Sequence, residues 1–352
     1  LIAALVLPSF IFSLQRLRGF HFPIPRINGF RIATIAILLW PLTLVLGSWA
    51  STQDGFSWLI LPPLLLFAIG LPVWWLIEFA RRRLSSGSLQ RSWGIINFSL
   101  LITNPLVVFV EIVVFFLLLM ILVLWVLNQP ALLKEFEMLA QKVLSFRNDP
   151  EAILPLITPY LQKPFVILGI LILLSGLIPA IEELFKPLAL WLLVRHRLTP
   201  AEGFTAGALC GGSFALLESL LALAGPAQQG WAIVAIGRAG TGLLHITTTA
   251  LLGWAMARTW QKGSYRQLGL TYLASVALHG LWNALSFLMG MGILVENSPE
   301  KPVLLASLVR AAPVALVFLT LFLFSLLWAF NRHLRQPPST SEPAVFNSVQ
   351  SI

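Results

Sequence analysis

Residues 165–194 have the sequence FVILGILILLSGLIPAIEELFKPLALWLLV. A helix of this length and apolar character can cross the hydrocarbon core of a bilayer, which is roughly 30 Å thick. The segment nevertheless contains two adjacent carboxylates, Glu182 and Glu183. On insertion scales a charged side chain at the centre of a transmembrane helix costs roughly 2.5–3.5 kcal/mol. This pair of carboxylates therefore predicts either a reaction centre or an ion path inside a membrane.

The composition of the whole chain is that of a membrane protein. Of its 352 residues, 58% are hydrophobic and 11% are charged, whereas soluble domains have about 25% charged residues. The net charge of +9 would suggest nucleic-acid binding in a soluble protein. Here the Lys and Arg residues lie between apolar segments, so they indicate topology and contact with the lipid bilayer, and we expect no nucleic-acid partner.

The apolar segments predict an all-α fold, a polytopic transmembrane helix bundle with eight or nine spans. We expect the first, which begins at Leu1, to be a truncated span. The segments are residues 1–14, 31–49, 57–79, 94–127, 165–194, 204–224, 231–257, 268–294 and 303–330.

The same pattern divides the chain into five parts. Residues 1–127 contain the amino-terminal spans, and residues 128–163 form an amphipathic extracytoplasmic loop. That loop either lies on the outer membrane surface or caps the bundle. Residues 164–294 form a core with polar residues in its spans, residues 295–335 contain the final span, and the Pro- and Ser-rich residues 336–352 form a disordered tail.

Basic residues are concentrated in alternate loops. Arg and Lys cluster at residues 16–26, 81–91, 195–197, 258–266 and 332–335, and the intervening loops are neutral or of mixed charge. Because cytoplasmic loops are enriched in Lys and Arg, this alternation predicts an outside amino terminus and a cytoplasmic carboxyl terminus. We expect an integral protein of a bacterial cytoplasmic membrane.

Four consecutive spans of the core each have polar residues at intervals of three or four, which places each set on one helix face. At about 1.5 Å per residue, Glu218, His245 and His279 fall near the middle of their spans, and the Glu182–Glu183 pair falls at similar depth. The four sets are Ser175, Pro179, Glu182/Glu183 and Lys186; Gly207, Gly211, Phe214 and Glu218; Arg238, Thr241, His245 and Thr248/Thr249; and Ser275, His279, Asn283 and Ser286.

Two features of the backbone favour a functional site inside the bundle. Pro179 has no N–H group and in a straight helix frees the carbonyl of Ser175, and Pro187 does the same for Glu183. On the next span, Gly203, Gly207 and Gly211 form a strip of small residues that lets a neighbouring helix approach closely.

Each polar residue also has a simpler structural explanation. Glu182 and Lys186 are four residues apart and can neutralise each other, whereas Glu183 lies about 100° round the helix and fits that pairing less well. His245 can be a satisfied core histidine and Asn283 an interhelical hydrogen-bond donor. For Arg238 we predict a structural counter-ion role, and for Glu111 an interhelical hydrogen bond.

Carboxylates and imidazoles at one depth can polarise a water molecule, and His and Asn can stabilise an oxyanion. The same side chains can bind a divalent metal such as zinc. The chain has no HExxH pair, no GxSxG elbow and no P-loop, which argues against the familiar zincin, serine-hydrolase and nucleotide-driven mechanisms.

Four motifs on successive spans resemble those of the PrsW-family intramembrane proteases. Residues 182–186 (EELFK) resemble the EExxK motif, and residues 214–218 (FALLE) resemble FxxxE. His245 and residues 279–283 (HGLWN) resemble the histidine motifs that follow. The family is similar to the CAAX-prenyl proteases and their bacteriocin-processing relatives, whose motifs are EExxxR, FxxxH and HxxxN. Lys186 and Glu218 fit the PrsW pattern better, while Asn283 matches HxxxN.

The resemblance implies an endopeptidase that cleaves membrane-embedded proteins or peptides. It implies that Glu182 or Glu183 activates the water and that Glu218 and His245 assist as co-bases or metal ligands. It also implies that His279 and Asn283 donate to an oxyanion or supply a further ligand. If a metal such as zinc takes part, the implied ligands are Glu183, Glu218, His245 and His279.

Two other classes of function remain open at this point. A cation-coupled membrane transporter would also place Glu and His at mid-depth, although the sequence shows no inverted repeat. A non-catalytic membrane scaffold would keep the fold without needing the full polar set.

Overall fold

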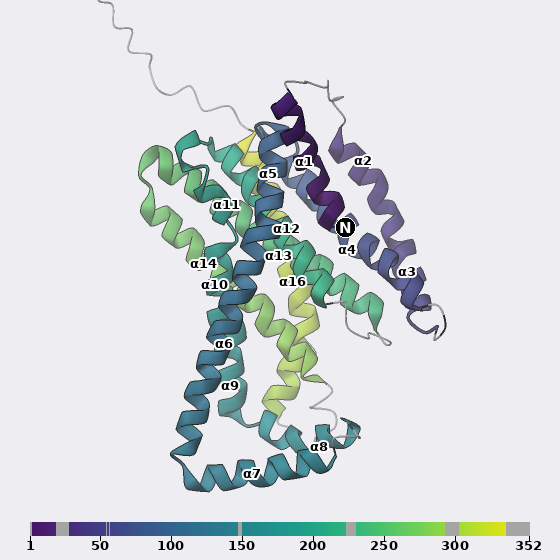
Figure 1. Cartoon of the computed structure of the whole chain (residues 1–352), viewed down its shortest axis with the longest axis vertical. Coiled ribbons are helices and arrows are strands. Elements are labelled where there is room, and N and C mark those ends of the chain that lie inside the picture. The colour runs from purple at the N-terminus through teal and green to yellow at the C-terminus, as the bar shows by residue number, and fades with distance from the viewer. Residues whose placement is uncertain are drawn as a thin grey trace, which may run out of the picture.

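A computed structural model of the chain describes residues 2–18, 28–53, 55, 57–146, 150–222, 230–292 and 303–335. All regular elements in these ranges are helical (Figure 1). In the amino-terminal half they are α1 (Ile2–Arg18), α2 (Gly29–Ala36), η1 (Ile37–Leu39), α3 (Trp40–Ala50), α4 (Ser57–Arg81), α5 (Leu89–Phe98), η2 (Ser99–Thr103) and α6 (Asn104–Leu127). They continue with α7 (Pro130–Ser145), α8 (Pro150–Leu161), α9 (Pro164–Ile172), η3 (Leu173–Leu177), α10 (Ile178–Phe185), α11 (Leu188–Trp191), η4 (Val194–His196), α12 (Pro200–Ala222), α13 (Trp231–Lys262), α14 (Tyr265–Gly290) and α16 (Val303–Leu334).

Seven helical segments in the described ranges are long and apolar enough to cross a membrane. This confirms the predicted all-α polytopic architecture, but not a count of eight or nine. The apolar part of α1 is limited to Leu5–Gln15, and α13 is not among the seven because its centre is polar. The seven are Gly29–Ala50, Ser57–Arg81, Leu89–Leu127, Pro164–Trp191, Pro200–Ala222, Tyr265–Gly290 and Val303–Leu334.

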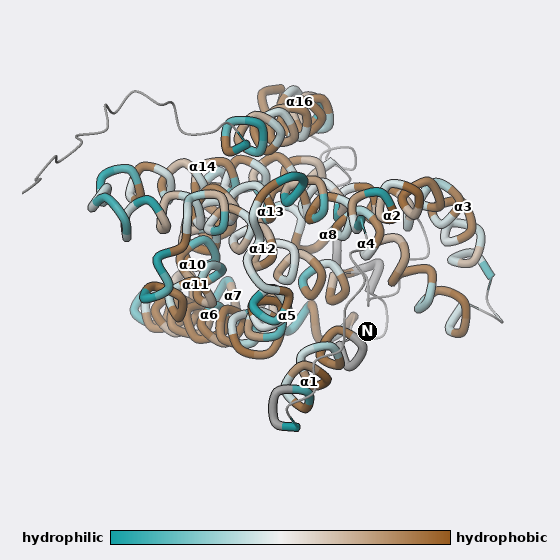
Figure 2. Tube along the Cα trace, turned by 90° about the horizontal axis from the view of Figure 1, so that it is seen from above, coloured by the Kyte–Doolittle hydropathy of each residue, from teal (hydrophilic) through white to brown (hydrophobic). Residues whose placement is uncertain are grey.

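Helices α12 and α13 lie in the middle of the bundle when it is viewed from above, and α3, α6 and α16 lie at its edge (Figure 2). The outer helices are strongly apolar, and α6 exposes Phe109 by 63% and Phe116 by 60%. In water such a surface would favour aggregation, whereas in a bilayer it contacts lipid tails. The molecule is therefore an integral membrane protein.

The predicted extracytoplasmic loop at residues 128–163 is helical where it is described. Helix α7 lies across the lower end of α6 in Figure 1, and α8 follows it. On which side of the membrane these helices lie stays a prediction. The predicted disordered tail, residues 336–352, lies outside the described residues.

Local sequence signals account for the ends of the central helices. Thr199 and Glu202 form a capping box at the start of α12, because Glu202 N donates to Thr199 Oγ1 at 3.2 Å and Thr199 N donates to Glu202 Oε2 at 3.0 Å. Pro200 takes the first helical position, which needs no N–H donor. Helix α13 ends at Gly263, whose φ of 69° suits a glycine C-cap.

The glycine strip on α12 fits directly against the backbone of α13, as the spacing predicts. A Cβ atom added at Gly207 would lie 2.1 Å from Thr249 O, and one at Gly211 would lie 2.2 Å from His245 O. Such distances are far inside van der Waals contact. The glycines therefore allow the backbones of α12 and α13 to pack in direct contact, and this contact sets the position of His245 relative to α12.

We expect Gly207→Ala to destabilise the protein by about 1–3 kcal/mol, the usual cost of overpacking a close contact. Gly237→Ala on α13 is the matched control, because nothing lies within 4 Å of a Cβ at that position. There the better helix propensity of Ala should leave stability unchanged or raise it. Thermal unfolding in detergent measures both, and equal shifts for the two variants would contradict the close-packing assignment.

The basic segments lie at one end of the bundle, where hydrogen bonds join them. Asn331 Nδ2 donates to Ala80 O at 2.7 Å, which places the end of α16 beside the end of α4. Gln261 Nε2 donates to Leu198 O at 2.9 Å, which joins the end of α13 to the start of α12. Two pairs of the basic segments are thus neighbours in the fold, as the alternation of loop charge predicts.

Candidate active site

The segment that carries the two carboxylates begins with an irregular turn. Between α9 and α10 lies the π-helical turn η3, in which each N–H donates to the carbonyl five residues earlier. Pro179 has no N–H, so it leaves Leu174 O without a helical partner. Asn283 Nδ2 donates to this carbonyl at 2.8 Å. The carbonyl that receives a side-chain donor thus lies one residue before Ser175, whose carbonyl a straight helix would free.

Lys186 is paired with both neighbouring carboxylates. Its Nζ lies 2.9 Å from Glu182 Oε2 and 2.8 Å from Glu183 Oε1. Both partners are within reach because residues three and four apart are neighbours on a helix surface, so the expectation that Glu183 fits this pairing poorly is not met. Lys186 is 0% exposed, Glu183 1% and Glu182 6%, which makes Glu182 the more accessible carboxylate of the pair.

His245 on α13 connects this cluster to α12. Its Nδ1 lies 2.7 Å from Lys186 Nζ, and its Nε2 lies 2.6 Å from Glu218 Oε2. An ammonium group can only donate, so Nδ1 accepts from Lys186 and the ring proton on Nε2 is directed at Glu218. Arg238 NH2 lies 2.7 Å from the same Glu218 oxygen, which agrees with the predicted counter-ion role.

His279 on α14 closes the other side of the cluster. Its Nδ1 lies 2.9 Å from Glu183 Oε1, and Nδ1–H donating to the carboxylate leaves a lone pair on Nε2. This Nε2 lies 3.8 Å from Glu182 Oε2. The separation is too long for a hydrogen bond and suits a water molecule that contacts both atoms.

Aromatic packing encloses the polar groups. Lys186 Nζ lies 4.5 Å from the ring centroid of Phe214, within cation–π distance. The same ring packs edge-on against His245 at 5.1 Å between centroids. Phe214 of the predicted FxxxE motif thus contacts the site directly, one helical turn before Glu218.

Glu182, His245 and His279 are also the described residues that fit a metal ion. Each offers one donor atom, and the three atoms lie within 4.8 Å of one another. Two His and one Glu, with a further position open, form a common donor set of catalytic zinc sites. Glu183 and Glu218 bind the other nitrogen of each ring, as carboxylates do beside zinc-binding histidines. The donor chemistry therefore fits a metal, with Glu182 in the group and with Glu183 and Glu218 behind the rings.

The structure brings together five of the six predicted catalytic residues: Glu182, Glu183, Glu218, His245 and His279. The sixth, Asn283, lies one turn beyond His279 with its amide nitrogen on Leu174 O. This contact matches the simpler explanation, an interhelical hydrogen bond.

Glu111 lies near the candidate site, although the sequence analysis predicted only a structural role for it. The Glu111 carboxyl on α6 lies close enough to the Glu182 carboxyl to interact with it electrostatically, and its Oε1 has no hydrogen-bond partner among the described residues. The predicted interhelical hydrogen bond stays a prediction, and the neighbour of Glu111 on the next helix is a candidate catalytic group. In the sequence Glu111 is recognisable only as a carboxylate deep in an apolar span, and this does not indicate that it lies near Glu182.

The sequence profile of the PrsW family intramembrane metalloproteases matches residues 152–331, about half of the chain. The chain belongs to this family. No curated protein and no solved structure matches it. The matched region contains all four predicted motifs, so this PrsW-family member is an intramembrane protease, a hydrolase that acts on membrane proteins within the bilayer.

Proposed function

We propose that this PrsW-family protein hydrolyses peptide bonds of membrane-embedded proteins or peptides with a water molecule activated at Glu182. The observation that carries the proposal is the pairing of Glu182 Oε2 with the free Nε2 of His279 across 3.8 Å. Glu182 is also the less buried of the two adjacent carboxylates. Glu182 takes a proton from the water as the water oxygen attacks the carbonyl carbon of the substrate, and it gives that proton to the leaving nitrogen when the C–N bond breaks.

The remaining residues hold this pair in place. Glu183 accepts the Nδ1–H of His279 and so directs its Nε2 towards Glu182. Glu218 holds the ring of His245 in the same way. Lys186 neutralises the two neighbouring carboxylates, so that they can stay close together in a water-poor interior. We assign Asn283 the task of fixing α14 against η3, which places His279.

A divalent metal would be held by Glu182, His245 and His279, the donor set that fits zinc. Bound there, it would act as a Lewis acid that lowers the pKa of a water molecule, and Glu182 could hold it through one carboxylate oxygen while the other accepts the water proton. Lys186 Nζ now contacts two of the same three residues, so binding of a metal requires Lys186 to give up its contact with His245 Nδ1.

The proposal is tested by reconstituting the protein in vesicles with a set of single-span peptides and analysing the products by mass spectrometry. We expect cleavage within or next to the hydrophobic segment by wild-type protein and none by a Glu182→Gln variant. Ion-gradient-driven uptake without any peptide-bond cleavage would instead establish the transporter alternative. Equal cleavage by the wild type and the variant would reject Glu182 as the base.

We expect a strong divalent-metal chelator to abolish cleavage and added zinc to restore it. Bound zinc, measured by elemental mass spectrometry, should be close to one equivalent in wild-type protein and should be lost in His245→Ala and His279→Ala variants. Cleavage that persists in the chelator, with no zinc bound, would contradict the metal assignment and leave a glutamate–histidine mechanism.

We further propose that the basic end of the bundle faces the cytoplasm, as the excess of Lys and Arg in those loops favours. Single cysteines placed at Arg82 and Lys262 in a Cys210→Ser background should be protected from a membrane-impermeant reagent in intact cells. A cysteine at Lys134 in α7 should be labelled. Labelling at Arg82 and protection at Lys134 would reverse the orientation.

A further inference from the structure

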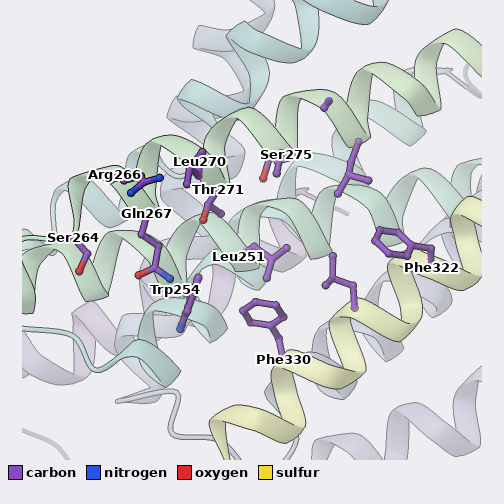
Figure 3. A pocket seen from close by; sticks show the side chains of 14 residues that line it. Leu251, Trp254, Ser264, Arg266, Gln267, Leu270, Thr271, Ser275, Phe322 and Phe330 are labelled. Carbon is purple, nitrogen blue, oxygen red and sulfur yellow. The ribbon is translucent and has the colours of Figure 1, made fainter.

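A large groove lies on the outside of the bundle between α13, α14 and α16 (Figure 3). Its volume is about 850 Å³. The walls are apolar, and Figure 3 shows Leu251 and Phe330 between the two ends of the groove. Leu270 is 57% exposed and Phe322 is 52% exposed, so the walls are only partly covered by protein. In a bilayer this groove must be filled by something apolar.

The two ends of the groove differ in chemistry. Ser264, Arg266 and Gln267 form one end, and Phe322 lies at the other (Figure 3). The three polar residues can all donate hydrogen bonds, and Arg266 takes part in none of the ion pairs found among the described residues.

The surroundings of the polar end are positively charged. The described parts of α13, α14 and α16 contain no Asp or Glu. The ends of the helices that form this part of the groove carry further positive charge, from Arg258 and Lys262 on α13 and Arg332 on α16. An occupant of the groove therefore meets uncompensated positive charge at one end and apolar side chains along the rest.

The length of the groove matches one leaflet of the membrane. From Arg266 to Leu278 along α14, a rise of 1.5 Å per residue gives about 18 Å. Half of a hydrocarbon core of roughly 30 Å is about 15 Å. An acyl chain with its headgroup at Arg266 fits this length, whereas a transmembrane helix would extend well beyond the groove.

The position of the groove also argues against a substrate segment. On α14, Leu270, Ala274 and Leu278 line the groove. Tyr272 lies on another face, where its hydroxyl donates to Ala180 O at 2.8 Å, and Asn283 lies there too with its amide on Leu174 O. Helix α14 therefore separates most of the groove from the carboxylates of the candidate active site.

We propose that this groove binds one anionic phospholipid, with its phosphate at Arg266 and an acyl chain along α14 and α16. The lipid fills the groove between α16 and the α13–α14 pair, and its contacts with both sides stabilise the packing of α16 against the bundle. The proposal does not depend on proteolysis, because it rests on the apolar walls and the charge at the polar end.

The test is native mass spectrometry of the full chain released from bilayer nanodiscs that contain equal amounts of phosphatidylglycerol and phosphatidylcholine. We expect wild-type protein to retain one phosphatidylglycerol preferentially. Arg266→Gln should weaken retention about fivefold, the effect of one basic residue near a lipid headgroup. Ala274→Trp should fill the groove and abolish the preference.

Two matched controls separate the groove from general effects. Arg310→Gln removes the same charge towards the other end of α16, and Leu273→Trp adds the same ring at the residue before Ala274, which does not line the groove. Both controls should retain the lipid. Equal retention of the two lipids by wild-type protein would overturn the proposal, and so would equal losses in variants and controls. Capture of a polypeptide, in place of a lipid, by a photo-crosslinker at residue 274 would also overturn it.

Discussion

Replacing Glu182 by Gln is expected to slow peptide-bond cleavage by about 10²–10⁴-fold, the usual effect of losing a general base. The amide keeps the size of the side chain and can still contact Lys186 and the water, so folding and substrate binding should persist. The loss should therefore appear in kcat, with little change in KM. Quantitative product analysis with a single-span peptide in vesicles measures both constants.

Glu78→Gln is the matched control, because Glu78 pairs with Arg81 away from the candidate site. It should leave the rate within a factor of two or so of the wild-type rate, since exposed and interfacial ion pairs contribute little. Glu183→Gln should also slow cleavage, because it weakens the hydrogen bond that the carboxylate accepts from His279 Nδ1. Undiminished cleavage by a Glu182→Gln, Glu183→Gln double variant would end the proposed mechanism.

The second large effect is expected from Lys186→Met, which removes the cation that lies between two buried carboxylates. Breaking a buried ion pair by removing one partner costs about 3–5 kcal/mol, because the other charge is left uncompensated. We expect a drop of this size in the free energy of unfolding, measured in detergent by the fluorescence of the tryptophans.

A compensating change distinguishes lost charge balance from lost packing. Adding Glu183→Gln to Lys186→Met removes one of the orphaned charges and should recover a large part of the stability. Lys262→Met, at an exposed position near the end of α13, should change stability by less than about 0.5 kcal/mol. If Lys186→Met is as stable as the wild type, Lys186 does not neutralise the pair.

Much of this arrangement could be predicted from spacing alone. Intervals of three and four residues place His245 and His279 on inward helix faces, and the glycines at 203, 207 and 211 predict the close contact of α12 with α13. These signals are periodic, and they hold for any straight helix at bilayer depth. That is why the fold and most of the candidate site residues could be predicted.

The remaining features depend on three-dimensional detail that the sequence pattern does not contain. Pro179 follows a π turn, and the carbonyl that receives the amide of Asn283 is Leu174 O, one residue before the one that a straight helix would free. The long side chain of Lys186 extends beyond its own helix to His245. Neither the register of an irregular turn nor the rotamer of a flexible side chain can be derived from residue spacing.

The contact between Glu111 and Glu182 has a consequence for how the protein can be divided. The family profile begins at residue 152, but α6, which ends at Leu127, places a carboxyl group beside the candidate base. A second polar contact crosses the same boundary, because Asn104 Nδ2 donates to Ser213 O at 3.1 Å. The two parts are therefore not independent modules, and a chimera whose first spans lack a carboxyl group at this place would change the surroundings of Glu182. A substitution in the amino-terminal spans can thus alter the surroundings of the candidate base while every family motif stays unchanged.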